Sequence, residues 1–193
     1  MRNTVLISCV TIILSFTSCE KSLLLLSSYK AATFVVDGEM AYVNGVLGKT
    51  AHKRFKKLLE EYPDVKTLIL EDVPGSMNDE YNVQTCELLH LNGISTKAMS
   101  YSEVASGGVD LLISGTNRTV EDGAKIGVHS WSSGNTEGID YPIDSPEHEI
   151  FLDLFEAIGI YTAFYWYTLR AAPADSIHWM TESEIDYYHI RTE

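Results

Sequence analysis

The run VKTLILEDV, at residues 65–73, constrains the fold more than any other segment. It is largely apolar, and Pro63 and the turn Pro74-Gly75-Ser76 enclose it. A strand that is covered on both faces has an almost continuous apolar sequence, and such strands are typical of parallel sheets. The run therefore predicts a buried strand of a parallel sheet.

Strand and helix patterns alternate along the rest of the chain. Strand patterns are short apolar runs that end at turn residues, and helix patterns place apolar residues three or four positions apart. The expected strands are residues 32–38, 65–73, 94–101 and 124–131, and the expected helices are residues 49–63, 80–93, 147–159, 160–173 and 181–190. Residues 132–146 are expected to be an irregular loop. This order predicts an α/β domain with a mostly parallel sheet.

Three helix ends are marked by residue type. Thr50 is placed to cap the first helix, Gly93 is expected to close the second, and Thr181 with Glu184 has the pattern of a capping box. Cys86 lies within a helical pattern and is expected to be a small core residue.

The first 19 residues have the pattern of a secretion signal. Met1-Arg2 carries a positive charge, and the apolar run that follows, VLISCVTIILSFTSC, is too short for a comfortable membrane span. Its end resembles a bacterial lipobox, in which the last cysteine, here Cys19, becomes lipid-modified. The alternative is a plain cleaved signal with an incidental cysteine. The sequence predicts export to the periplasm or cell envelope, membrane attachment through a lipid on Cys19, and a single domain over residues 20–193.

Charge and cysteine content exclude several classes of partner. The net charge of −13 and the pI near 4.8 disfavour nucleic acid and anionic lipid as partners, because both need a basic surface. Beyond the leader, Cys86 is the only cysteine, so an internal disulfide or a thiolate zinc site is not expected. No metal or cofactor is predicted.

Three turns follow predicted strands and could meet at one edge of the sheet. They are Pro74-Gly75-Ser76, Ala105-Ser106-Gly107-Gly108 and Gly127-Val128-His129-Ser130-Trp131. Parallel α/β sheets build their sites at the carboxyl ends of the strands. A serine needs a base to act as a nucleophile, and the oxyanion that forms needs aimed N–H donors. The three turns together offer these parts.

The order of these segments resembles that of the ClpP/crotonase superfamily, and within it the serine peptidases of Clp protease type. The resemblance is carried by DVPGS, VASGGVDLLISG and KIGVH, and it extends over residues 33–190. It implies a spiral of repeated β-β-α units with C-terminal helices. It also implies a serine hydrolase that cleaves a peptide or ester bond through an acyl-enzyme, without a cofactor. Ser106 would be the nucleophile, His129 the base, and Gly75, Ser76 and Gly107 the oxyanion hole.

Two positions depart from the family pattern. The turn that is usually Gly-Gly is Gly75-Ser76 here. The acid position falls on Ile177, when Trp179, Met180 and Thr181 are matched to the family segment. Asp175 is the nearest candidate acid; Asp153 and Glu147 are others, and a Ser-His dyad without an acid is the remaining alternative.

Two other functional classes remain open at this point. A catalytically inactive member that serves as an envelope binding or assembly module would be consistent with Ile177. A crotonase-type acyl-CoA enzyme is disfavoured by the predicted export and by the serine–histidine pair.

Simpler interpretations exist for the main candidate residues. Ser106 could be a helix cap, and His129 a core histidine. Ser130 lacks the flanking glycines of a nucleophile elbow. His148 is expected to be exposed at a helix start, and no His-rich metal spacing occurs. The bulky run FYWYTL, residues 164–169, is expected to form core or a homo-oligomer interface, with a substrate-binding wall as the alternative.

Overall fold

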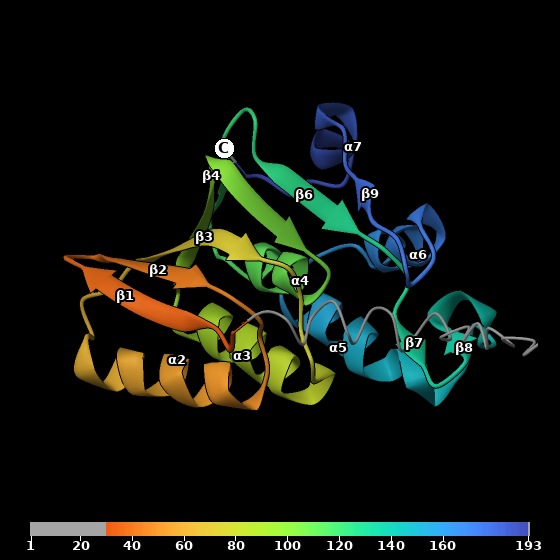
Figure 1. Ribbon diagram of the computed structural model, residues 1–193, viewed down its shortest axis with the longest axis horizontal. Helices are drawn as coiled ribbons and strands as arrows, with labels where there is room; N and C mark the ends of the chain where they lie inside the picture. The colour runs from red at the N-terminus through yellow and green to blue at the C-terminus, as the bar shows by residue number, and fades with distance from the viewer. Residues whose placement is uncertain (1–29, 193) are drawn as a thin grey trace, which may run out of the picture.

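A seven-stranded, mostly parallel sheet organises the chain (Figure 1), and the computed structural model describes residues 30–192. The predicted leader and Cys19 lie outside the described residues, so export and lipid attachment stay predictions. Among the helices of residues 30–192, none has both the length and the apolar character that crossing a bilayer requires.

The strand order is β1-β2-β3-β4-β6-β9, with β5 paired to β4. The four central pairings, β2 with β3 and β4 with β3, β5 and β6, are parallel, whereas β1–β2 and β6–β9 are antiparallel. The strands are β1 (Thr33–Asp37), β2 (Met40–Asn44), β3 (Thr67–Val73), β4 (Ser95–Ala105), β5 (Arg118–Val120), β6 (Lys125–Val128) and β9 (His178–Trp179); a separate small hairpin is made of β7 (Ser132–Ser133) and β8 (Thr136–Glu137).

Strand β4 is the longest strand, and it divides the sheet in two. Its first half pairs with β5 and its second half with β6, and its register with β3 shifts between Leu70 and Asp72. The second half carries the chain to Ala105, directly before Ser106. The carboxyl ends of β4 and β6 therefore lie side by side, as the sequence predicts for the serine and histidine turns.

Helices cover the sheet, and helix α3 lies at the centre of their packing. It contacts α2, α4 and α5, and Figure 1 shows α2 and α3 side by side beneath the strands. The helices are α2 (Lys49–Glu61), α3 (Asp79–Leu91), α4 (Gly107–Ile113), α5 (Glu149–Ala157), α6 (Thr162–Ala171) and α7 (Glu182–Tyr187), with 3-10 turns η1 (Gly138–Asp140) and η2 (Pro146–His148).

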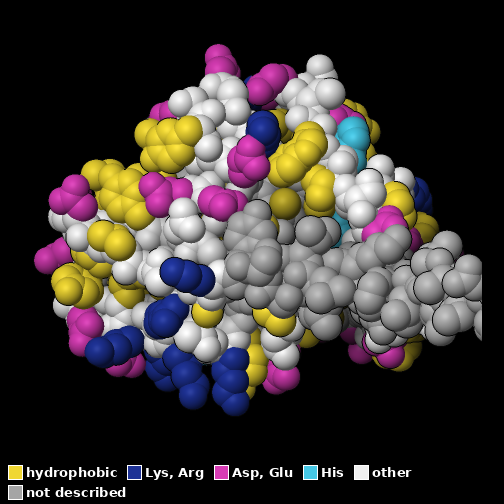
Figure 2. Space-filling view, in the orientation of Figure 1, with side chains coloured by type: hydrophobic (Ala, Val, Ile, Leu, Met, Phe, Trp, Pro, Cys, Tyr) yellow, Lys and Arg dark blue, Asp and Glu magenta, His cyan; other side chains and the backbone are white. Residues whose placement is uncertain are grey.

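Helix α2 shows how the apolar spacing positions a helix. Ala51, Phe55 and Leu58 are buried against the sheet, and burial of each large side chain contributes roughly 1.5–3 kcal/mol. The cationic residues of α2 lie on the opposite face, where Figure 2 shows Lys and Arg gathered at one edge of the molecule.

The core confirms the main strand and helix predictions. Leu68, Ile69 and Leu70 are consecutive and all buried, so both faces of β3 are covered. Cys86 is fully buried, Gly93 has a positive φ of 68° after α3, and the capping box at the start of α7 is present.

Three local expectations are wrong. Thr50 is not a cap, because α2 begins at Lys49 with Gly48 at the N-cap position. The expected loop at 132–146 contains the β7–β8 hairpin and η1. His148 is fully buried rather than exposed, because the aromatic rings of Trp131, Tyr165 and Trp166 surround it. The short strands β2, β5 and β9 were not expected at all.

Candidate active site

Ser106 forms the corner between β4 and α4 and has a strained backbone. Its φ of 52° and ψ of −130° lie in a region that favours glycine, the first central position of a type II′ turn. Such a conformation costs about 1–3 kcal/mol in a non-glycine residue. The corner is fixed by hydrogen bonds from Ser106 N to Gly127 O (2.9 Å) and from Val109 N to Ser106 O (2.7 Å).

The side chain of Ser106 does not cap the helix that it precedes. It occupies the N-cap position of α4, but it makes no capping hydrogen bond. The capping interpretation of Ser106 therefore fails, although its place at the helix start is as expected. Residues with a strained backbone cluster at functional sites, and the Ser106 side chain makes no capping bond that would explain the strain.

The two glycines after Ser106 are required by close packing. A Cβ atom on Gly107 would lie 2.6 Å from Ser76 Cβ and 2.8 Å from Asn82 Nδ2. A Cβ atom on Gly108 would lie 2.5 Å from the carbonyl oxygen of Val73. The tight corner brings the start of α4 against the Gly75-Ser76 turn, as the sequence predicts.

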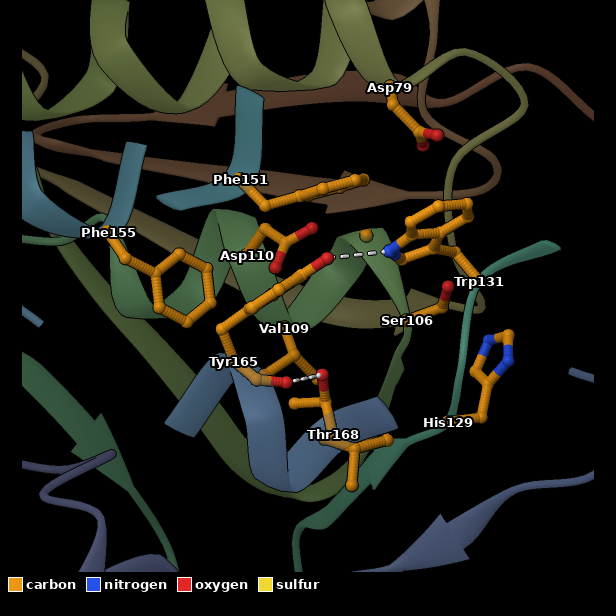
Figure 3. Close-up of a pocket in the computed structure, with 12 residues that line it drawn as sticks. Asp79, Ser106, Val109, Asp110, His129, Trp131, Phe151, Phe155, Tyr165 and Thr168 are labelled. Atoms are coloured by element: carbon orange, nitrogen blue, oxygen red, sulfur yellow. Dashed lines mark hydrogen bonds between the residues drawn. The ribbon is translucent and has the colours of Figure 1, made fainter. Parts of the chain in front are cut away.

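A cavity of about 50 Å³ opens beside Ser106. Its lining includes Gly107, His129 and a set of aromatic side chains (Figure 3). The lining residues are Asp79, Ser106, Gly107, Val109, Asp110, Val128, His129, Trp131, Phe151, Phe155, Tyr165 and Thr168. The structure therefore brings the predicted nucleophile and the predicted base to one cavity.

His129 follows β6 directly, and its ring reaches this cavity. Burial lowers the pKa of its imidazole, and the neighbouring backbone of Ser130 partly offsets this effect. A lowered pKa keeps the ring neutral near pH 7, the form in which it can accept a proton. Within the described residues, no hydrogen bond joins His129 to Ser106, and catalytic hydrogen bonds are often long in unliganded sites.

No carboxylate is bonded to Nδ1 of His129 in the part of the chain that the structure describes. Its Nδ1 atom is buried and has no hydrogen-bond partner. In the antiparallel β6–β9 pair, the last paired residues are Val128 and His178. His129 follows Val128 and Ile177 precedes His178, and the Ile177 side chain packs against Gly127, where a built Cβ would lie 2.6 Å from Ile177 Cγ2. An aliphatic side chain thus occupies the position at which the resemblance implies an acid.

The three candidate acids do not approach this histidine. Asp175, Asp153 and Glu147 are all exposed, and none of them lines the cavity. The arrangement of the described residues is that of a serine–histidine pair without an orienting carboxylate.

The expected oxyanion-hole residues differ in their position relative to the cavity. Gly107 lines the cavity, and its N–H is the first of a helix, which has no acceptor within that helix. Ser76 lies against Gly107, and neither Gly75 nor Ser76 lines the cavity. The Ser76 hydroxyl is occupied, because it donates to Asn78 O at 2.9 Å.

Ser130 can be set aside as a nucleophile. Its side chain is fully buried and donates to the carbonyl of Trp131 at 3.1 Å. In residues 30–192, no group of three His, Cys, Asp or Glu side chains is arranged to hold a metal ion.

Sequence reasoning missed the carboxylates and rings that shape the cavity. Asp79 and Asp110 both line it, and so does Tyr165, whose hydroxyl accepts from Trp131 Nε1 at 2.9 Å. The same hydroxyl lies 2.6 Å from Nδ1 of His148. One signal was available, because Asp110 is the only charged residue in the apolar segment of α4.

Comparison with known proteins adds information on the fold alone. No protein-family model matches the chain, and no curated protein matches it in sequence. A mutant of the 1510-N membrane-bound stomatin-specific protease, solved with a substrate peptide, superposes with a TM-score of 0.52 at 15% identity. That match covers 82% of this chain and 75% of the protease. A methylmalonyl CoA decarboxylase gives a TM-score of 0.52 at 11% identity, with 85% and 67% covered.

The chain has a ClpP/crotonase-like fold. Two further matches are partial, and both have a TM-score of 0.39. An enoyl-CoA hydratase from Polaromonas sp. JS666 is 9% identical, and 51% of its chain is covered. An enoyl-CoA hydratase from Bacillus anthracis is 13% identical, and 49% of its chain is covered. The ClpP/crotonase-like fold includes both a protease and acyl-CoA enzymes among its structural neighbours, so the chemistry has to be argued from the site.

Proposed function

We propose that this protein is a serine hydrolase that cleaves a peptide or ester bond through an acyl-enzyme on Ser106. The observation that carries the proposal is the strained Ser106, which makes no capping bond and shares a cavity with the neutral His129. A helix cap or a core histidine would not need this arrangement.

The first half of the reaction forms the acyl-enzyme. A nitrogen of His129 accepts the hydroxyl proton while Ser106 Oγ attacks the substrate carbonyl. The resulting oxyanion accepts hydrogen bonds from the N–H of Gly107 and from an N–H of the Gly75-Ser76 turn. Collapse of the tetrahedral species expels the amine or alcohol, which takes the proton from His129.

The second half regenerates the serine. Water gives a proton to His129 and attacks the acyl carbon, and Ser106 leaves with that proton returned. The products are a carboxylic acid and the free enzyme. Without a carboxylate at Nδ1 of His129, the imidazolium is stabilised less, so turnover is expected to be slower than in a complete triad.

A second function is favoured by one observation. Ile177 at the position where the family resemblance implies an acid, together with the unpartnered Nδ1 of His129, suits a catalytically inactive protein that uses the cavity to bind a ligand. The two functions differ in whether Ser106 reacts, and one experiment separates them.

The test is covalent labelling of the purified mature protein with a fluorophosphonate probe. The wild type should be labelled, whereas Ser106→Ala should not, and His129→Ala should be labelled at least ~100-fold more slowly. Ser133→Ala, which changes an exposed serine in the β7–β8 hairpin, is the matched control and should label like the wild type. If wild type is labelled no faster than Ser106→Ala, the hydrolase proposal is wrong and the binding module stands.

A further inference from the structure

Asp110 is the only charged residue of helix α4. All other residues of α4, from Gly107 to Ile113, are buried and apolar or glycine. The Asp110 carboxylate has one hydrogen bond among the described residues, from Asn82 Nδ2 at 3.5 Å, which is at the outer limit of such a bond. No described cation pairs with it. Asp110 is half-buried, and a carboxylate that is partly withdrawn from water with only this long hydrogen bond is unfavourable, so its retention calls for an explanation.

A second carboxylate faces the same cavity from another helix. Asp79 belongs to the first turn of α3, lines the cavity, and also has no ion pair within residues 30–192. Burial raises the pKa of Asp110 to about 7, and the charge of Asp79 adds to the effect. First-turn positions favour carboxylates through the helix dipole, but this does not explain why both carboxylates line one cavity.

Aromatic rings form the remaining walls. Phe151 stacks between Trp131 and Tyr165, with ring centroids 5.9 Å and 5.5 Å away. The Tyr165 hydroxyl is held by Trp131 and His148, which fixes the ring. Figure 3 shows the carboxylates of Asp79 and Asp110 above Ser106, with the Trp131 and Tyr165 side chains around them. These rings hold one another in place and form rigid, largely apolar walls beside the two carboxylates, where an ion pair is screened less than in water.

We propose that the cavity is a specificity pocket for a primary ammonium group, carried by the substrate close to the bond that Ser106 attacks. The inference rests on the proposed hydrolase function. Ser106 and His129 locate the proposed active site at this cavity. The two carboxylates bear only on which substrate the site prefers. Its volume of about 50 Å³ suits the end of one side chain, such as the ammonium and last methylenes of a lysine.

The test compares two substrates that differ in charge. They are the 4-nitrophenyl esters of an Nα-acyl lysine and of an Nα-acyl norleucine, which has a similar chain without the ammonium. The wild type should show a kcat/KM at least ~10-fold higher for the lysine ester, because its ammonium would pair with a carboxylate in a partly desolvated site. Asp110→Asn should bring the ratio of the two values close to one, and Asp79→Asn should lower it. Asp122→Asn, an exposed control, should leave the ratio unchanged.

Two results overturn the inference while leaving the hydrolase proposal intact. One is fluorophosphonate labelling of Ser106 with no preference for the lysine ester. The other is a preference that Asp110→Asn does not change. Either result would assign the carboxylates to stability or to hydrogen bonding with a neutral substrate.

A binding measurement tests the pocket if Ser106 does not react at all. Thermal unfolding of the wild type is followed with n-butylammonium chloride, with n-butanol, and with sodium chloride at the same ionic strength. The ammonium alone should raise Tm, and Asp110→Asn should abolish the rise. An equal response to all three additives would overturn the pocket assignment independently of catalysis.

Discussion

The surroundings of Ser106 and those of His129 differ in how closely they hold each residue. On the serine side, Ser106 is strained, and the glycines at 107 and 108 allow backbone and side chains to approach within distances that no Cβ would tolerate. On the histidine side, Nδ1 of His129 is buried without a partner among the described residues, and Ile177, where the family resemblance implies an acid, packs against Gly127. The proposed function therefore rests more on the constrained serine corner than on His129, whose Nδ1 has no partner among the described residues.

The serine corner should be the more sensitive to a small change. Gly108→Ala places a methyl group against the carbonyl of Val73, which belongs to a buried strand and cannot move away. We expect a loss of about 3 kcal/mol in the free energy of unfolding, at the upper end of overpacking effects. Urea denaturation measures this loss. Gly134→Ala is a useful comparison, because a Cβ there meets nothing within 4 Å, although its φ of 58° also adds strain. Equal losses in the two variants would contradict the packing argument.

The histidine side should instead be improvable. Ile177→Asp places a carboxylate at the position where the family resemblance implies an acid, and there it can accept a hydrogen bond from Nδ1 of His129 and stabilise the imidazolium. We expect fluorophosphonate labelling to be about 10–100-fold faster, a part of what the acid contributes in a complete triad. The pH midpoint of labelling should also rise, because a nearby carboxylate raises the pKa of the histidine.

The matched control for this change is Ile177→Asn. It offers an acceptor of similar size without a charge, so it should orient the ring but leave the pH midpoint where it is in the wild type. A folded Ile177→Asp protein that is labelled no faster than the wild type would show that residue 177 does not occupy the acid position.

The difference between the two sides also explains what the sequence could predict. Strand β3 and helix α2 follow from local periodicity, and the capping box of α7 from residue type, because these features are decided by neighbours in the chain. The meeting of Ser106 with His129 depends on the pairing of β4 with β6, and it was expected only through the order of motifs.

Other features of the site could not be reached from the sequence. The partial burial of Asp110 and its proximity to Asp79 depend on how α3 packs on α4. His148 was expected to be exposed because it lies at a helix start, and it is buried because α6 brings aromatic rings over it. Such contacts join residues from separate helices, and no local pattern records them.

The acidic pocket next to the corner should make stability depend on pH. The pKa of Asp110 is about 7 in the folded protein, against an ordinary 3.8. The folded state therefore holds more protons than the unfolded state between these values, so the contribution of Asp110 to stability is full below pH 3.8 and is lost as pH rises toward 7. Asparagine does not titrate. The difference in unfolding free energy between Asp110→Asn and the wild type should change by about 2 kcal/mol from roughly pH 5 to pH 8, in favour of the variant.

Urea titrations of both proteins at several pH values measure this difference. The groups that share the pocket or lie near Asp110, namely Asp79, Cys86, His129 and Tyr165, are present in both proteins, so most of their own titration cancels. A difference that stays constant over this range of pH would contradict a raised pKa at Asp110.

The smallest expected effect tests the strain at the corner itself. Glycine adopts the φ of 52° found at residue 106 without steric cost, whereas alanine keeps the Cβ that makes this conformation unfavourable. Relief of strain is partly offset by the greater freedom of glycine in the unfolded chain. We therefore expect Ser106→Gly to be more stable than Ser106→Ala by about 0.5–1 kcal/mol in urea denaturation, while neither variant reacts with the fluorophosphonate probe. If Ser106→Gly proves the less stable of the two, the corner stores no strain at this residue, and the contrast between the serine and histidine sides loses its main support.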